Sequence, residues 1–250
     1  MKRILAIGLI CMLFIPLVFS QGTNSSNNGG AFLKRIEYNR RVFVNGYNLD
    51  SKGDIEKRFW GNFNAPVEFF YDHSFDGQSG FRLVWDSLKN TNILEIKFIL
   101  NFKEIQKKSY EKYPLRTLSS SEMDVLPKDS LDLISKQNYE NMQKAQEEQR
   151  KLGGNIDSRS FPVSNQFADI LYKKMVSIIG NFKGSGIAPL IDDGYRVTFR
   201  TVVDDEVWSL SIHCPQEKAL KMADICIQIL KDAKNNQLDE AKYIKLLDDF

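Results

Sequence analysis

Histidine is the side chain best suited to acid–base catalysis and zinc binding, and this sequence contains two, His73 and His213. Neither lies in an HExxH or comparable ligand spacing, and the sequence has no CxxC pair and no Gly-x-Ser-x-Gly turn of the serine hydrolases. Cys214 follows His213 directly, but adjacent strand residues point to opposite faces, which separates a base from a nucleophile. The local motifs therefore assign no catalytic residue and no cofactor.

A first candidate for binding is the loop that begins at Asp72. Asp72, Ser74 and Asp76 have the oxygen-ligand spacing that opens a calcium loop, and Gly77 occupies the sixth position as that motif requires. However, the twelfth position is Leu83, where a bidentate glutamate belongs, and the flanks are predicted strands instead of helices. A polar turn between two strands is the simpler interpretation, with the calcium site as its alternative.

A second candidate is a predicted hairpin between Gly194 and Pro215. Apolar and polar residues alternate on both sides of Asp204-Asp205, which predicts two antiparallel strands joined by a two-residue turn. One face then carries two arginines, a histidine and hydroxyl side chains: Arg196, Arg200, His213, Ser209 and Ser211, together with Thr198. Because arginine binds planar anions through paired hydrogen bonds, this face is a candidate site for a carboxylate, sulfate or phosphate. The alternative is a solvated sheet face, which needs no ligand.

The elements that must position these residues begin with an antiparallel meander. Alternating apolar residues between Pro66 and Phe102 predict three strands, separated by turn-forming clusters at residues 76–80 and 89–92. Residues 31–63 mix aromatic and basic residues without a clean period, and we assign them to the fold without an element type.

Helices are predicted in the middle of the chain and at its end. A long polar helix begins at Asp129 or Ser130 and extends to about Leu152 before a Gly-Gly pair. Ser164 opens an amphipathic helix that reaches the glycines at 184–186, and Pro215 starts another that runs to about Ala233. Residues 239–250 form a short terminal helix in this prediction.

This order of elements is typical of an α+β protein. We expect an antiparallel sheet, made of the meander and the C-terminal hairpin, with helices packed largely on one face. Residues 31–250 are expected to form a single domain, or two closely packed lobes, 31–115 and 160–250, joined by a helical segment.

Residues 1–20 have the features of a secretory signal peptide. Two basic residues precede an apolar run at 4–19, and Val18 and Ser20 occupy the small-residue positions before cleavage. The run is shorter than the roughly 20 residues of a membrane-spanning helix, so we expect no transmembrane segment after cleavage. Residues 21–30 (QGTNSSNNGG) are predicted to be a flexible tether.

The charges of the remaining chain balance. The sequence has 34 Lys and Arg against 32 Asp and Glu, and the predicted signal contains Lys2 and Arg3 without any acid. A neutral chain with interspersed charges has no electrostatic footprint for nucleic acid. Partners are therefore expected among envelope or extracellular molecules, and the location is expected to be periplasmic or secreted.

Two segments resemble parts of known proteins. FWGNFNAPVEFFYD (Phe59–Asp72) and GYRVTFRTVVDDEVWSLSIHCP (Gly194–Pro215) are similar to segments of small exported proteins from Gram-negative gut bacteria that have no assigned activity. The resemblance implies an envelope location and transfers no catalytic residue.

Two classes of function are compatible with these features. The first is a non-enzymatic envelope protein that works as a binding or interaction module. The alternative is a hydrolase of envelope or dietary polymers with dispersed catalytic carboxylates, which leave no local signature. A cleft with two facing acids would favour the hydrolase, and a shallow surface with an aromatic or basic patch would favour the binding module.

Overall fold

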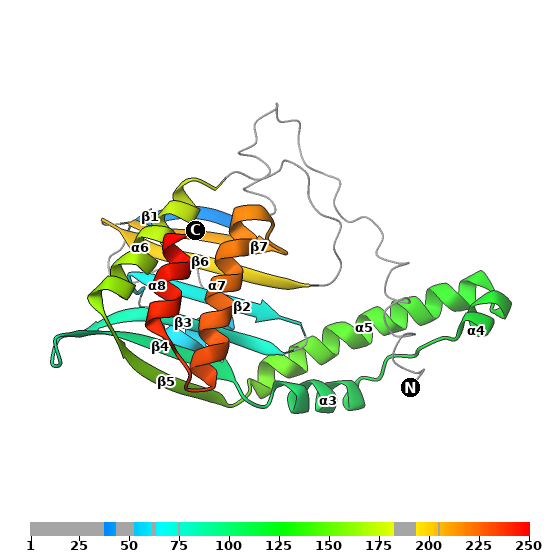
Figure 1. Cartoon of the computed structure of the whole chain (residues 1–250). Coiled ribbons are helices and arrows are strands. Elements are labelled where there is room, and N and C mark those ends of the chain that lie inside the picture. Colours follow the sequence, from blue (N-terminus) through cyan, green and yellow to red (C-terminus); the bar gives the residue numbers. More distant parts are fainter. Residues whose placement is uncertain (1–37, 44–52, 62–63, 75, 183–193, 205) are drawn as a thin grey trace. The chain divides into compact units, whose positions relative to one another are not determined.

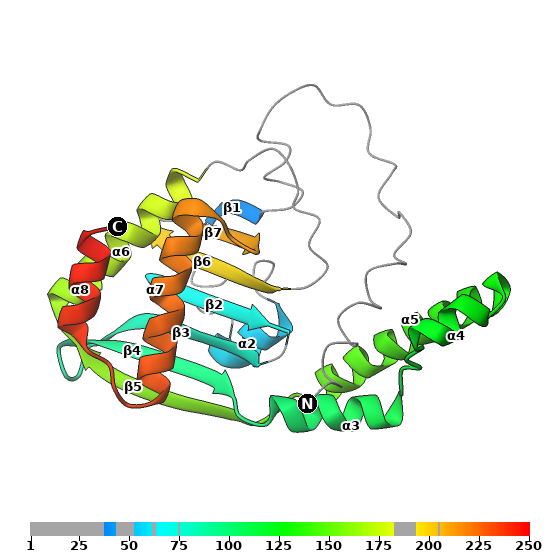
Figure 2. The same cartoon turned by 45° about the vertical axis from the view of Figure 1, so that its right-hand side comes forward.

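The computed structural model describes residues 38–43, 53–61, 64–74, 76–182, 194–204 and 206–250, with residues 38–43 described by their backbone alone. The predicted signal peptide and tether lie outside these residues. The described chain forms two compact units, a helical unit at Asn101–Gly154 and a sheet unit from the residues on either side of it. Figures 1 and 2 show their elements.

The sheet unit contains one antiparallel sheet of seven described strands in the order β1-β7-β6-β2-β3-β4-β5. Its strands are β1 (Tyr38–Phe43), β2 (Val67–His73), β3 (Gly77–Asp86), β4 (Thr91–Ile99), β5 (Ile156–Val163), β6 (Tyr195–Val203) and β7 (Glu206–His213). The predicted meander is β2 to β4 and the predicted hairpin is β6 and β7. They join in one sheet because β2 pairs with β6.

The register predicted for the hairpin is confirmed. Val203 pairs with Glu206 across a two-residue turn, and Arg196 pairs with His213. Asp204 has a φ of 52°, which suits the tight turns that connect two antiparallel strands. Asp205 lies outside the described residues.

Three helices cover one face of the sheet, as expected for the α+β fold: α6 (Asn165–Gly180), α7 (Glu217–Lys234) and α8 (Glu240–Asp248). In Figures 1 and 2 they lie on the same side of the strands. The core between them is apolar on both sides, with Phe69, Phe81 and Phe199 from the sheet and Phe167, Met175 and Met222 from the helices. This burial is the main stabilising contribution to the sheet unit.

On the opposite face of the sheet lies the short helix α2 (Asp54–Trp60), from the stretch to which the sequence assigned no element type. The Phe59 ring meets the Phe70 ring of β2 edge-on at 5.8 Å. Arg82 of β3 and Lys97 of β4 lie over the Trp60 ring at 5.0 and 5.1 Å, and the Lys97 ammonium donates to the Phe59 carbonyl. These contacts fix α2 on β2, β3 and β4.

Predicted boundaries of α6 and α7 differ from the structure. The Ser164 hydroxyl accepts from the Phe167 N–H, which confirms the predicted N-cap of α6, but the helix ends at Gly180, before the glycines at 184–186. The predicted start of α7 at Pro215 is wrong by two residues. Cys214 and Glu217 have left-handed φ values of 50° and 48°, which a continuous right-handed helix does not accommodate.

The helical unit contains α3 (Phe102–Lys112), α4 (Ser120–Val125) and α5 (Lys128–Leu152). Sequence predicted α5 but missed α3 and α4. The predicted start of α5 at Asp129 or Ser130 is wrong, because the helix begins at Lys128 with Pro127 as its N-cap. Asn138 of α5 accepts from the Arg116 N–H and donates to its carbonyl, both at 2.8 Å, and Asn141 donates to the Pro114 carbonyl. The extended segment between α3 and α4 is thereby held along α5.

This division of the chain differs from the two lobes considered from sequence. Residues 31–115 and 160–250 do not form separate lobes, because their strands share one sheet. The helical segment is instead a compact unit inserted between β4 and β5.

Candidate functional site

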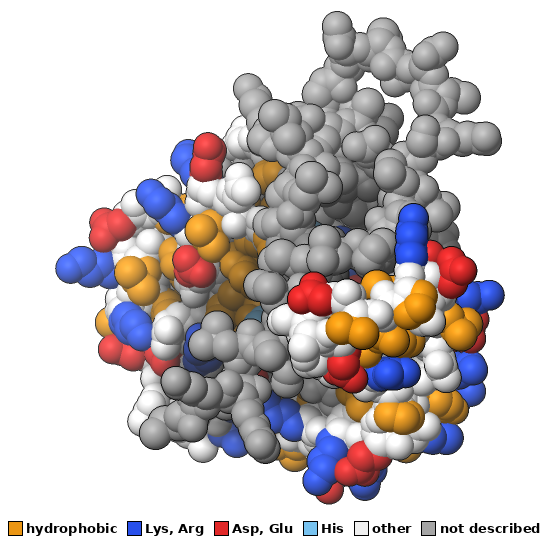
Figure 3. Space-filling view, turned by 90° about the vertical axis from the view of Figure 1, so that its right-hand side faces the viewer, with side chains coloured by type: hydrophobic (Ala, Val, Ile, Leu, Met, Phe, Trp, Pro, Cys, Tyr) orange, Lys and Arg blue, Asp and Glu red, His pale blue; other side chains and the backbone are white. Residues whose placement is uncertain are grey.

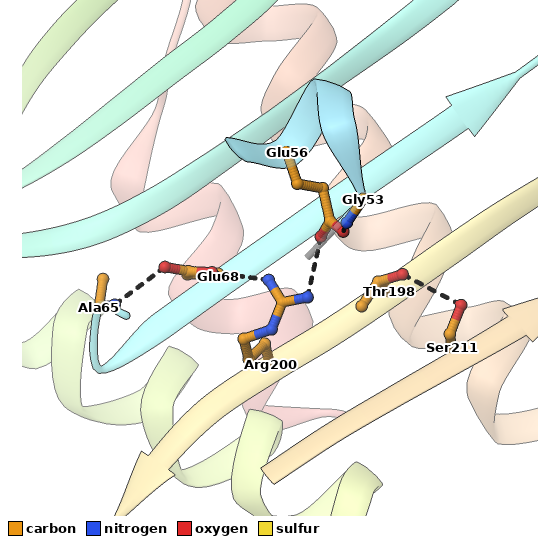
Figure 4. Close-up of polar contacts among 7 residues, drawn as sticks. All are labelled: Gly53, Glu56, Ala65, Glu68, Thr198, Arg200 and Ser211. Atoms are coloured by element: carbon orange, nitrogen blue, oxygen red, sulfur yellow. Dashed lines mark hydrogen bonds and ion pairs between the residues drawn. The ribbon is translucent and has the colours of Figure 1, made fainter. Parts of the chain in front are cut away.

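Arg200, the central residue of the predicted anion site, lies in the middle of β6 with 1% of its surface exposed. Its Nη1 donates to Glu68 of β2 at 2.8 Å, and its Nη2 donates to Glu56 of α2 at 3.0 Å. Figure 4 shows the two carboxylates on either side of the guanidinium, beneath α2. Glu68 is the register partner of Arg200 in the neighbouring strand.

The other carboxylate oxygens are also satisfied. Glu68 accepts from the Ala65 N–H, and Glu56 accepts from the Gly53 N–H at the start of α2, both at 2.9 Å. Burial by itself would lower the pKa of Arg200, but the carboxylates of Glu56 and Glu68 outweigh it and raise the pKa above its ordinary value. The guanidinium is therefore permanently charged, and its counter-charges belong to the protein.

This placement corrects the predicted anion site. Arg196 is exposed to solvent whereas Arg200 is buried, so the two guanidiniums do not converge on a common ligand. The Thr198 hydroxyl donates to Ser211 at 3.1 Å, as Figure 4 shows. Ser209 is buried opposite Arg200, with no hydrogen-bond partner for its hydroxyl among the described residues. His213 is half-buried at the end of β7.

The three residues of the calcium-loop hypothesis have separate partners. Asp72 accepts from the Gln78 side chain at 2.8 Å, and Ser74 donates to the Gly194 carbonyl at 3.1 Å. The Asp76 N–H donates to His73 Nδ1 at 3.2 Å. Among the described residues, no group of three His, Cys, Asp or Glu side chains is arranged to hold a metal ion. The geometry fits a polar turn between β2 and β3.

A different group gathers at the end of the sheet where β2 ends and β6 begins. His73 pairs with Tyr195 across these strands, and Tyr71 lies two residues before His73, so all three side chains project from the same face. The ring centroids of Tyr71 and Tyr195 are 5.3 Å apart at 64°, those of Tyr71 and His73 are 5.6 Å apart, and those of His73 and Tyr195 are 6.5 Å apart. We call these three residues the strand-end cluster.

The strand-end cluster is half-buried, and its tyrosines pack against the core. Burial, with Tyr195 and Asp76 nearby, raises the pKa of Tyr71 to about 12. Burial, with Asp224 of α7 and Cys214 nearby, also raises the pKa of Tyr195. Both phenols therefore keep their protons at neutral pH, and no described residue hydrogen-bonds to either hydroxyl. Such rings offer a ligand an apolar surface together with hydrogen-bond donors.

Sequence reasoning missed this cluster and the carboxylates of Arg200. In an alternating strand pattern Tyr71 and Tyr195 are simply apolar residues and Glu68 is a polar one, so the pattern assigns none of them to a site. The signal that identifies both groups is the pairing of β2 with β6, which brings together residues more than 120 positions apart. No local pattern contains that information.

The two carboxylates that bind Arg200 are candidates for the catalytic acids of the hydrolase alternative. Dispersed-carboxylate hydrolases need both acids on a bond of the substrate. Glu56 and Glu68 are buried and already bound to the guanidinium, so neither reaches a polymer chain while α2 is in place.

Comparison of the chain with protein-family models, with curated proteins and with solved structures gave no match. In the described part of the chain, no helix combines the length and the apolar character needed to cross a membrane. Figure 3 shows basic and acidic side chains interspersed on the face it displays, with hydrophobic side chains between them. This pattern agrees with the near-zero balance of charge in the sequence.

Proposed function

We propose that this protein is an exported binding module that holds its ligand at the strand-end cluster. The observation that carries the proposal is the contact of three half-buried rings from two strands, Tyr71, His73 and Tyr195. Tyrosines of this kind are enriched where proteins bind partners, because a rigid ring supplies contact area at low entropic cost and its hydroxyl supplies a hydrogen bond.

Export to the periplasm or the medium is part of the same proposal. It is supported by the signal-like sequence of residues 1–20 and the polar tether at 21–30. A tethered domain with an aromatic binding surface suits an envelope or extracellular partner.

Arrays of immobilised glycans and peptides, probed with the purified labelled protein, test the proposal. Binding should be lost in the double variant Tyr71→Leu/Tyr195→Leu, because leucine keeps apolar bulk and removes the ring and the hydroxyl. The matched control is Tyr139→Leu, an exposed tyrosine of α5 in the helical unit, which should bind like the wild type. Signals that survive the double variant, or the absence of any signal from the wild type, would contradict the proposal.

A further inference from the structure

The helical unit is an insertion that the core of the sheet unit does not use. That core is built from the strands and from α6, α7 and α8, and none of its described residues comes from Asn101–Gly154. The chain leaves and re-enters the sheet at neighbouring positions, where the Leu100 N–H donates to the Asn155 carbonyl at 2.9 Å. A tight turn can join two antiparallel strands at such a point, so the sheet does not need the unit to be complete. The helical unit is therefore available for recognition.

A groove lies where the end of α3 meets the C-terminal half of α5. It has a volume of about 290 Å³, near the lower limit for pockets that hold a small organic molecule. Its lining consists of Tyr113, at the C-cap of α3, and five residues of α5, Gln143, Lys144, Glu147, Glu148 and Lys151. The α5 residues share one side of the helix, because they recur at spacings of three and four.

Both carboxylates of the groove are paired with cations of the same unit. Glu148 accepts from Lys112 at 2.9 Å, and Glu147 lies 3.7 Å from both Arg150 and Lys151. The hydrogen bond to Glu148 raises the pKa of Lys112, so this ammonium stays charged at neutral pH. The two acids are thus neutralised within the chain and offer little attraction to a cationic ligand.

Lys144 differs from these paired side chains. It lines the groove and is exposed, and among the described residues no carboxylate lies within ion-pair distance of it. Tyr113 is half-buried, and the Lys112 ammonium lies over its ring at 5.5 Å. A tyrosine ring has two faces and an edge, so one cation leaves ring surface for a further contact. A flat ring and a lysine charge without a described counter-charge therefore line the same groove.

We propose that this groove binds a small aromatic carboxylate, with its ring against Tyr113 and its carboxylate at Lys144. Aromatic rings attract one another in offset-stacked or edge-on pairs, and a lysine ammonium donates a charge-assisted hydrogen bond to a carboxylate. The Gln143 amide, which also lines the groove, can donate to the second carboxylate oxygen. The site is separate from the strand-end cluster and does not depend on the proposed function of that cluster.

Titration with 2-naphthoate and with 2-naphthamide, followed by the NMR signals of the Tyr113 ring, measures the contribution of charge. The two probes have nearly the same shape, and the amide is neutral. A molecule of this size in an open groove should bind in about the millimolar range. At low salt, naphthoate should bind about threefold more tightly than naphthamide, and added salt should reduce the difference. Equal affinity at low salt, or no naphthoate binding at millimolar concentration, overturns the inference.

Variants separate the ring from the charge. Tyr113→Leu should weaken naphthoate binding about fivefold, whereas Tyr113→Phe keeps the ring and should retain it. Lys144→Gln should weaken binding about threefold, because an exposed charge contributes through a screened interaction. Lys136→Gln, the same change at an exposed position of α5 outside the groove, is the control and should have no effect. Equal effects of the two lysine changes would contradict the role of Lys144.

The double variant Tyr71→Leu/Tyr195→Leu separates this site from the strand-end cluster. It should bind naphthoate like the wild type, because Tyr71 and Tyr195 belong to the sheet unit. Loss of naphthoate binding in the double variant would assign the probe to the strand-end cluster and overturn the inference for the groove. If naphthoate fails while array ligands depend on Tyr71 and Tyr195, the groove inference falls and the proposed function stands.

Discussion

Two groups of side chains on the same pair of strands differ in burial and in the partners they have. In the middle of β2 and β6, Glu68 faces Arg200, and Glu56 closes over them from α2. At the end of the same strands, His73 faces Tyr195, and the rings stay half-buried. In the first group the guanidinium is neutralised by two carboxylates of its own chain, whereas the second has phenolic hydroxyls that no described residue uses.

The comparison separates a structural role from a binding role. A buried charge is tolerated when it is paired with an opposite charge and hydrogen-bonded to it, so such a group fixes the fold around it. An amphipathic ring at a strand end tolerates water and can exchange it for a ligand. We therefore expect changes in the first group to reduce stability and changes in the second to reduce binding.

The largest expected effect is on Arg200. Arg200→Met leaves two carboxylates buried without their counter-charge, which should lower the free energy of unfolding by about 3–5 kcal/mol. Urea denaturation of the purified protein measures it. Arg196→Met, on the same strand but exposed, should change stability by no more than about 0.5 kcal/mol. The triple variant E56L/E68L/R200M should recover most of the loss, and equal losses in R200M and R196M would contradict the structural role.

Two cysteines show the same difference in burial between the core and the strand end. Of the two cysteines among the described residues, neither of which is in a disulfide, Cys226 is buried in the core and Cys214 is half-buried beside Tyr195. Burial raises the pKa of the Cys226 thiol, so its reactive thiolate is rare. A thiol reagent should modify Cys214 at least about a hundredfold faster than Cys226 in the folded protein. Similar rates would show that the core opens as readily as the strand end.

The free energy of unfolding should fall at alkaline pH because of Tyr71 in the strand-end cluster. Since the pKa of Tyr71 is raised from 10.0 to about 12, the folded protein holds this proton more tightly than the unfolded chain. Its contribution to stability is present below pH 10 and is lost as the pH rises toward 12. Urea denaturation across this range should show a smaller loss for Tyr71→Phe than for the wild type. Parallel curves for the two proteins would exclude the predicted coupling.

The smallest expected effect on stability is that of the tyrosines themselves. Tyr195→Leu removes one edge-on ring contact and should cost about 1 kcal/mol, well below the loss at Arg200. The same variant is expected to abolish ligand binding. Substitutions at Arg200 should therefore have a large effect on stability, and substitutions in the strand-end cluster should have a small effect on stability and a large effect on binding. A loss as large as that of Arg200→Met would mean that the cluster is a structural element.

Local pattern determined much of the sheet unit. Alternation of apolar residues located β2, β3 and β4, and the two-residue turn at Asp204 determined the register of β6 and β7. Serine at the N-cap determined the start of α6. These features were predictable because each depends on residues close together in the chain.

Only the tertiary structure decided which polar residues became a site. The alternation placed Arg200 on a polar face, but the pairing of β6 with β2 and the packing of α2 set two carboxylates against it. The same pairing brought Tyr195 to Tyr71 and His73. A period of two residues assigns a side chain to a face of the sheet, whereas its neighbours across that face come from strands distant in sequence. The sequence by itself therefore determined the faces, and the long-range strand pairing decided which polar residues are neutralised by one another and which rings are brought together.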